Sequence, residues 1–116
     1  MIEKQIINLL ELRDKAHLAH WKTQSYAEHK ALGKFYDGLL DFVDTFVETY
    51  QGKYGRLNLS GLVGLTVADS MDIVNETYSV VGSIEASIDK ECTDLLNILA
   101  DIKGLCNHTK YLLSLK

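Results

Sequence analysis

Four acidic side chains recur at helical spacing in the first half of the sequence. They are separated by four, three and four residues, and they are Asp37, Asp41, Asp44 and Glu48. At about 100° per residue this spacing stacks them on one side of a helix, about 160° from the mean direction of the apolar side chains of the same segment. Such a row is usually a solvated helix face. Because only Lys30 and Lys34 lie nearby to offset it, the row also fits a bound cation or the basic groups of a partner at a subunit boundary.

Three histidines precede the acidic row. His17 and His20 are followed directly by Trp21 on the apolar side of the first predicted helix, and His29 lies near the start of the second. Imidazoles in such positions commonly satisfy backbone carbonyls or a neighbouring acid. The alternative is metal ligation, for which neutral imidazole suits iron, zinc or copper. The fourth histidine, His108, is predicted to be structural or exposed.

Hydrophobic periodicity predicts four helices that position these groups. The first covers residues 2–22 and the second residues 26–54, because Ser25 and Glu28 form a capping box between them. The third and fourth are predicted over 67–86 and 89–115, the last capped by Ser87 or Asp89.

The length and composition favour a single all-α domain over residues 1–116. A chain of 116 residues has the size of one hydrophobic core, and the absence of proline leaves long helices uninterrupted. Four helices of this length pack most simply as an up-down four-helix bundle. The connection over residues 55–65 is expected to pack over the end of the bundle.

Charge and hydropathy exclude several classes of function. A net charge of -4 argues against nucleic-acid binding, because that affinity comes mainly from clustered Lys and Arg. No apolar run is long enough to cross a membrane, and the first residues do not resemble a signal peptide, so the expected location is the cytoplasm, or the host cytoplasm if the protein is viral. No nucleophile motif supports hydrolysis.

Cys92 and Cys106 are predicted to be buried free thiols. They lie fourteen residues apart in the same predicted helix, which separates them by about 21 Å along its axis and prevents a bond between them. An intermolecular disulfide is the alternative.

The order of the histidines and acids resembles the Dps family of mini-ferritins. The matching residues are His20-Trp21, then His29, then Asp44 and Glu48 one helical turn apart. The resemblance implies a ferritin-like bundle in which the imidazoles of one subunit and the Asp/Glu pair of a two-fold mate form an iron-oxidising site. Gly33 stands where the family has an acid, and Asp37 one turn later is the candidate replacement. The segment between His20 and His29 is shorter than in that family, and the lysine-rich tail of some members is missing.

The chain also resembles a group of small uncharacterised proteins of tailed bacteriophages. The resemblance lies in three segments, residues 25–32, residues 35–37 and residues 50–55. It implies the same bundle, but it does not by itself imply the iron chemistry.

The sequence leaves two hypotheses for the function. In the first, the protein is a non-enzymatic, ferritin-like, phage-encoded bundle that forms oligomers, dimers or larger, and binds a host, virion or small-molecule partner. In the second, it is an iron-binding ferroxidase of the Dps type, with iron or another divalent metal at a subunit interface. The metal ligands would be His20, His29, Asp37, Asp44 and Glu48.

Overall fold

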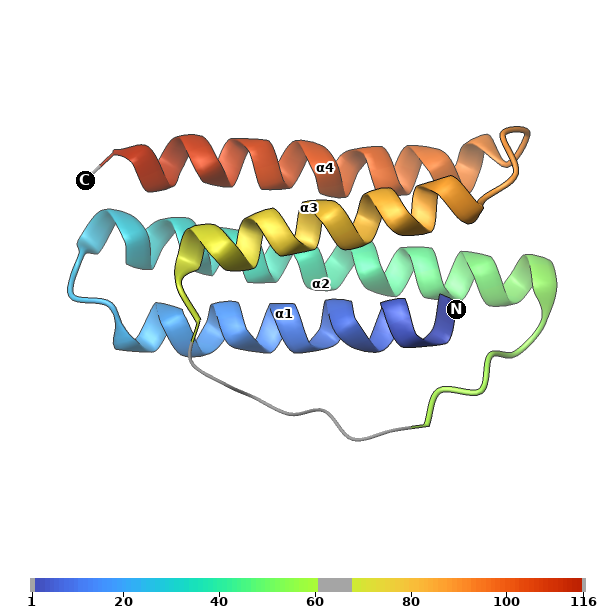
Figure 1. Cartoon of the computed structure of the whole chain (residues 1–116), viewed down its shortest axis with the longest axis horizontal. Helices are drawn as coiled ribbons and strands as arrows, with labels where there is room; N and C mark the ends of the chain where they lie inside the picture. The colour runs from blue at the N-terminus through green and yellow to red at the C-terminus, as the bar shows by residue number, and fades with distance from the viewer. Residues whose placement is uncertain (1, 61–67, 116) are drawn as a thin grey trace.

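The computed structural model describes residues 2–60 and 68–115, and this part of the chain is helical apart from its turns and connections. The four helices are α1 (Ile2–Lys22), α2 (Tyr26–Tyr54), α3 (Ser70–Ser87) and α4 (Thr93–Ser114). They lie side by side along the long axis of the molecule (Figure 1). The expected all-α class and four-helix bundle are therefore confirmed. None of these helices, within the ranges described, is long and apolar enough to span a membrane.

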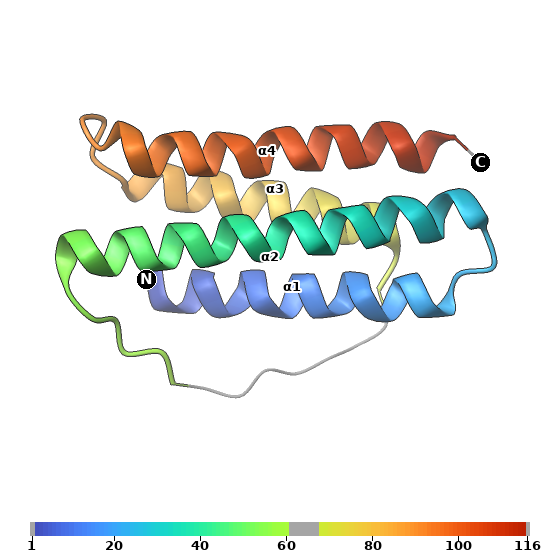
Figure 2. The same cartoon turned by 180° about the vertical axis from the view of Figure 1, so that it is seen from behind.

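Each helix packs mainly on two others. α1 and α2 form one antiparallel hairpin and α3 and α4 form a second, and the hairpins meet through α2 against α4 and α1 against α3. Seen from behind, α2 lies on the outside of the bundle between α1 and α4 (Figure 2). One face of α2 is therefore left open along the length of the helix.

The directions of the helices differ from the expected up-down order at the connection between the two hairpins. α2 ends at one end of the bundle and α3 begins at the other, so these two helices run in the same direction (Figure 1). A bundle with this connectivity has two short turns and one long crossover, whereas an up-down bundle has three short turns. The crossover includes residues 55–65, the segment that was expected to cover the end of the bundle, and residues 61–65 of that segment lie outside the described residues.

The ends of α1 and of α2 lie where the sequence places them. The Ser25 side chain accepts a hydrogen bond from the Glu28 backbone N–H at 3.2 Å, as predicted. The reciprocal half of the predicted capping box is not formed, because the Ser25 N–H donates to the Thr23 hydroxyl and the Glu28 carboxylate accepts from Thr23 and Ser70. Gly55 adopts a φ of 96°, and its N–H bonds to the Gln51 carbonyl. Glycine takes this conformation without steric cost, so it ends α2.

The predicted starts of the third and fourth helices are wrong by a few residues. Asp69 accepts hydrogen bonds from the N–H groups of Met71 and Asp72, so it is the N-cap and α3 begins after it; the predicted first residue, 67, lies outside the described residues. Asp89 caps a separate turn, because its side chain accepts from the N–H of Glu91 and its carbonyl accepts from the N–H of Cys92. The Ser87 hydroxyl donates to the Ile84 carbonyl. Neither predicted residue caps α4, which begins at Thr93.

The core contains apolar side chains from all four helices. Phe35 and Phe46 of α2 are its largest fully buried members. Both cysteines are free and buried, as predicted, and burial raises the pKa of the Cys106 thiol to about 12. The Cys92 thiol is hydrogen-bonded to the Tyr54 hydroxyl, which raises the pKa of Tyr54 to about 12.

Glu28 ties the α1–α2 turn to the start of α3. Its carboxylate accepts hydrogen bonds from the hydroxyl of Ser70 at 2.7 Å and from the hydroxyl of Thr23. Both bonds lower the pKa of Glu28 from its usual 4.5, and the bond from Ser70 has the larger effect. The ionised carboxylate therefore stabilises the end of the bundle at which α3 begins.

We expect Glu28→Gln to lower the free energy of unfolding by about 1–2 kcal/mol at neutral pH, because an amide replaces a charged acceptor at a partly exposed site. A lowered folded-state pKa adds stability that is present above the ordinary pKa and is lost as pH falls through the lowered value. The gap between wild type and variant should therefore shrink in acid. Urea unfolding at several pH values measures it, and Glu76→Gln, at an exposed position of α3, is the control. Equal effects of the two substitutions would contradict the role of Glu28.

Candidate functional site at the corner of α1 and α2

His20 and His29 form a reciprocal pair where α1 passes into α2. Their rings are stacked with centroids 3.7 Å apart and planes 17° from parallel. Nδ1 of His20 lies 2.7 Å from the His29 carbonyl oxygen, and Nδ1 of His29 lies 2.9 Å from the His20 carbonyl oxygen. Since carbonyls only accept, each Nδ1 carries the proton and donates it. His29 thus satisfies a carbonyl in the last turn of α1 that the helix itself leaves free.

Gly33 provides the space that the His20 ring occupies. A Cβ atom at position 33 would lie 3.1 Å from Cε1 of His20 and 3.4 Å from Nδ1. Its hydrogen bond to the His29 carbonyl and its stacking on His29 hold that ring in place, so a larger side chain would have to displace it. The structure thereby gives a physical reason for glycine at a position where the Dps family has an acid.

A ladder of flat side chains continues from this pair along the groove between α1 and α2. The His17 ring stacks on Tyr36 at 4.2 Å and contacts the Trp21 ring at 4.2 Å. The Arg13 guanidinium lies 5.5 Å from the centre of the Tyr36 ring on the other side of the groove. We call Arg13, Tyr36, His17 and Trp21 the ring ladder. Sequence reasoning missed Arg13 and Tyr36, although the spacing of four residues between positions 13, 17 and 21 was an available signal.

The structure brings together only part of the predicted metal site. The carboxylates of the acidic row are all exposed. Asp37, Asp44 and Glu48 lie about 12, 22 and 28 Å beyond His29 along the axis of α2. Within residues 2–60 and 68–115, no three His, Cys, Asp or Glu side chains lie close enough to hold a metal ion. A site built from the histidine pair and the Asp44/Glu48 pair therefore needs a second copy of the chain. His108 is exposed, as predicted.

Comparison with known proteins assigns the chain to a family. A family model described as "Family of unknown function (DUF5856)" matches residues 20–113. The chain belongs to this family. It is also 34% identical over 104 residues to an uncharacterised 14.6 kDa protein from the mobD–ri intergenic region of Enterobacteria phage T4. The aligned part covers 86% of the present chain and 77% of the phage protein. No solved structure matches the chain.

The DUF5856 match confirms one of the two resemblances. The predicted likeness to small uncharacterised phage proteins is borne out by the T4 relative. The likeness to mini-ferritins, and the metal site that it implies, stay predictions. The matched region of the DUF5856 family begins at His20 and includes His29 and the whole acidic row.

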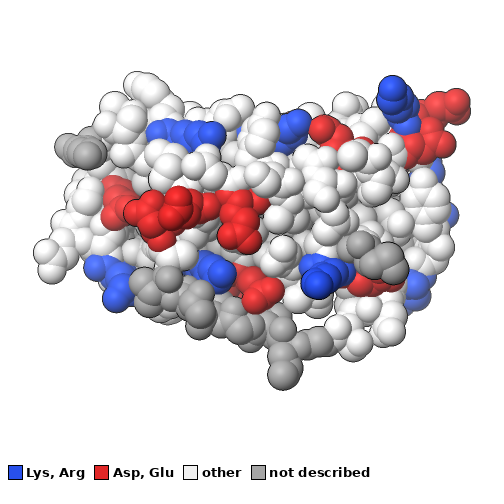
Figure 3. Space-filling view, in the orientation of Figure 1, with Lys and Arg blue, Asp and Glu red and all other residues white. Residues whose placement is uncertain are grey.

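A second concave feature lies beside the corner, between the end of α1 and the start of α3. It is a surface pocket of about 170 Å³ whose wall includes Lys15, Lys22, Glu28 and Asp69. Figure 3 shows carboxylates gathered over the first half of α3, with basic side chains beside them. The two lysines and two carboxylates of the pocket balance in charge, so the pocket shows no preference for an anion or a cation.

Gly33→Ala tests the packing at the corner. Alanine normally stabilises a helix by about 0.5–1 kcal/mol relative to glycine, but here its methyl group would press on the held His20 ring. We expect the substitution to lower the unfolding free energy and to disturb the stacked imidazoles, which proton NMR of the ring signals would report. Gly104→Ala of α4, where a Cβ meets nothing within 4 Å, should raise the unfolding free energy instead. If both substitutions raised the unfolding free energy, the His20 ring would be able to move aside without cost, and the proposed packing role of Gly33 would be wrong.

Proposed function

We propose that the protein acts by binding without catalysis, and that its α1–α2 corner docks on another protein. The observation that carries this proposal is Trp21. Its side chain is 68% exposed although it stands at the end of an ordered ladder of rings. The other large aromatic at this corner, Tyr26, is 76% exposed.

The energetics of an exposed and oriented indole favour a binding role. Trp, Tyr and Arg are the side chains most often found at the centre of protein interfaces, because they bury a large area with few rotatable bonds. Contact with His17, which is itself stacked on Tyr36, restricts the Trp21 ring before any partner arrives. A partner then loses little affinity to the ordering of the side chain.

The chemistry of the partner follows from the charges around Trp21. Lys22 and Lys30 are exposed on the same corner, and Nζ of Lys30 lies 5.9 Å from the centre of the Tyr26 ring. The surface that suits this corner is a protein with an apolar pocket for the indole and carboxylates at its rim. The relative from phage T4 favours a host or virion protein as the partner class.

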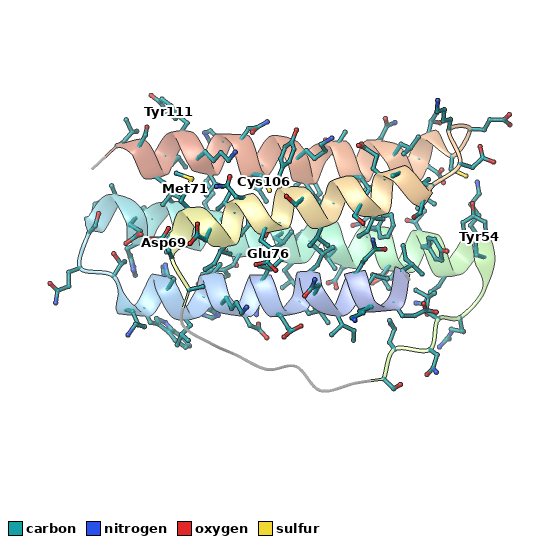
Figure 4. The ribbon with its side chains drawn as sticks, viewed as in Figure 1. Tyr54, Asp69, Met71, Glu76, Cys106 and Tyr111 are labelled. Atoms are coloured by element: carbon teal, nitrogen blue, oxygen red, sulfur yellow. The ribbon has the colours of Figure 1, made fainter. Side chains whose placement is uncertain are left out.

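Trp21→Ala should abolish capture of such a protein from cells in which this chain is naturally made, while helix content by circular dichroism stays unchanged. Tyr111→Ala is the matched control, because Tyr111 is 60% exposed and projects from α4, away from the α1–α2 corner (Figure 4). The control should retain every protein that the wild type captures. A partner that survives Trp21→Ala but is lost with Tyr111→Ala would contradict the proposed surface.

A metal site is the second candidate function, and the histidine pair supports it. Both Nδ1 atoms donate to backbone carbonyls, the arrangement that commonly orients metal-ligating imidazoles, and neither Nε2 has a partner among the described residues. The donor set of one chain is incomplete because Gly33 offers no carboxylate. Asp44 and Glu48 of a second copy, with Asp37 as a further ligand, would complete a set suited to ferrous iron as the bound substrate.

Anaerobic titration with Fe(II), followed by native mass spectrometry and exposure to air, tests the second candidate. Under this proposal the wild type binds iron in a fixed ratio to pairs of chains and develops ferric absorbance. The double variant Asp44→Ala with Glu48→Ala should bind none and keep its helix content, because both positions are exposed. The variant Asp72→Ala with Glu76→Ala, at exposed positions of α3, is the control. Equal iron uptake by the two double variants would exclude Asp44 and Glu48 as ligands.

A further inference from the structure

One continuous stripe of six charged side chains runs along the open face of α2. We call it the α2 stripe, and its members are Lys30, Lys34, Asp37, Asp41, Asp44 and Glu48. The steps between them are four, three, four, three and four residues, so all six lie within about 40° of one direction on the helix. All six are exposed. The ion pairs found among the described residues, Arg13–Asp14 and Lys103–Glu85, include none of them.

The order of the charges makes the α2 stripe self-complementary in one orientation only. The two lysines occupy its first third and the four carboxylates the rest. If two copies paired in parallel and in register, each residue would face its own copy and all six contacts would join like charges. If the second helix runs the other way, the lysines of each copy face carboxylates of the other.

We propose that two copies of the protein associate through α2, with the two helices antiparallel and the lysines of each α2 stripe against the carboxylates of the other. The two-fold axis then crosses α2 near its middle. Such a contact is isologous, so each ion pair occurs twice. This inference uses the open face of α2 and no residue of the ring ladder. It shares Lys30 with the corner that is proposed to dock on another protein.

Two registers satisfy this arrangement. With the axis between residues 35 and 36, Lys30 faces the partner's Asp41 and Lys34 faces the partner's Asp37. With the axis at residue 39, Lys30 faces the partner's Glu48 and Lys34 faces the partner's Asp44. The second register overlaps nearly the whole of α2 but sets Asp37 against the partner's Asp41.

Gly52 of α2 suits the register with the axis at residue 39. A Cβ at Gly52 would meet nothing within 4 Å, so packing inside one copy does not require glycine there. With the axis at residue 39, Gly52 faces the partner's Tyr26, the most exposed of the large hydrophobic side chains of α2. The absence of a side chain at Gly52 leaves room for that ring.

Analytical ultracentrifugation of the intact chain tests the association, at about 0.15 M salt and from about 1 µM to about 1 mM protein. The wild type should dimerise within this range. Lys30→Glu with Lys34→Glu makes the α2 stripe wholly acidic and should weaken dimerisation at least tenfold. A second variant with lysine at all four carboxylate positions should also be monomeric, and a mixture of the two should form the mixed dimer. A wild type that stays monomeric at about 1 mM, or variants that do not associate when mixed, would overturn the proposal.

Single cysteines read the direction of the two helices. Asp37→Cys places two thiols within about 5–6 Å of each other along the axis in either antiparallel register, whereas Glu48→Cys separates them by about 27 Å or more. Under mild oxidation Asp37→Cys should therefore form a linked dimer and Glu48→Cys should not. The native cysteines are buried and do not interfere. Equal linking by both variants would indicate a parallel pair and overturn the proposal.

Neutral substitutions read the register. Asp37→Asn with Asp41→Asn weakens the dimer if the axis lies between residues 35 and 36, and strengthens it if the axis lies at residue 39, because a like-charge contact is then removed. Asp44→Asn with Glu48→Asn weakens only the register centred on residue 39. Loss of affinity with either pair supports the antiparallel contact. No change with both pairs would overturn it.

Discussion

Two imidazole rings in face-to-face contact fix the path of the chain from α1 into α2. Each donates a hydrogen bond to the backbone carbonyl of the other, so neither ring can turn without leaving two polar groups unsatisfied. The His20 ring packs against Gly33, where a side chain would crowd it. The same corner brings α1 and α2 together so that His17 stacks on Tyr36 in the groove between them. The exposed Trp21 takes its orientation from that groove. A contact between two residues nine positions apart thereby determines the surface of one end of the molecule.

The position of α2 decides which of its residues face outward. The helix packs on α1 along one side and on α4 along the other, and its buried residues, such as Leu39 and Val43, point between them. The α2 stripe lies opposite these residues, and among residues 2–60 and 68–115 none of its charges takes part in an ion pair. The carboxylates and the two lysines are consequently available to another molecule along the full length of the stripe.

Local chemistry explains which features could be predicted from the sequence. Ser25 and Gly55 form their capping hydrogen bonds with residues three and four positions away, and the bounds of α2 follow from these bonds. The role of Asp89 was ambiguous in the sequence, because an aspartate caps a tight turn as readily as it caps a helix. In the structure Asp89 caps the turn before α4. The crossover between α2 and α3 depends on contacts between distant residues, which no local pattern reports. The stacking of His20 on His29 was equally hidden, since histidine spacing alone does not distinguish a ligand pair from two rings that bond to each other's backbone.

The division of the bundle into two hairpins has a consequence for how the chain folds. α1 meets α2, and α3 meets α4, across short turns, so these contacts are local and form early. The contacts of α2 with α4 and of α1 with α3 arise only when the completed hairpins collide. Since the chain contains no proline, no slow isomerisation of a prolyl bond delays that collision. The length of the connection between the hairpins then governs mainly the rate of docking through its loop-closure entropy, which changes slowly with length. Related proteins can therefore lengthen or shorten this connection while the four helices keep their arrangement.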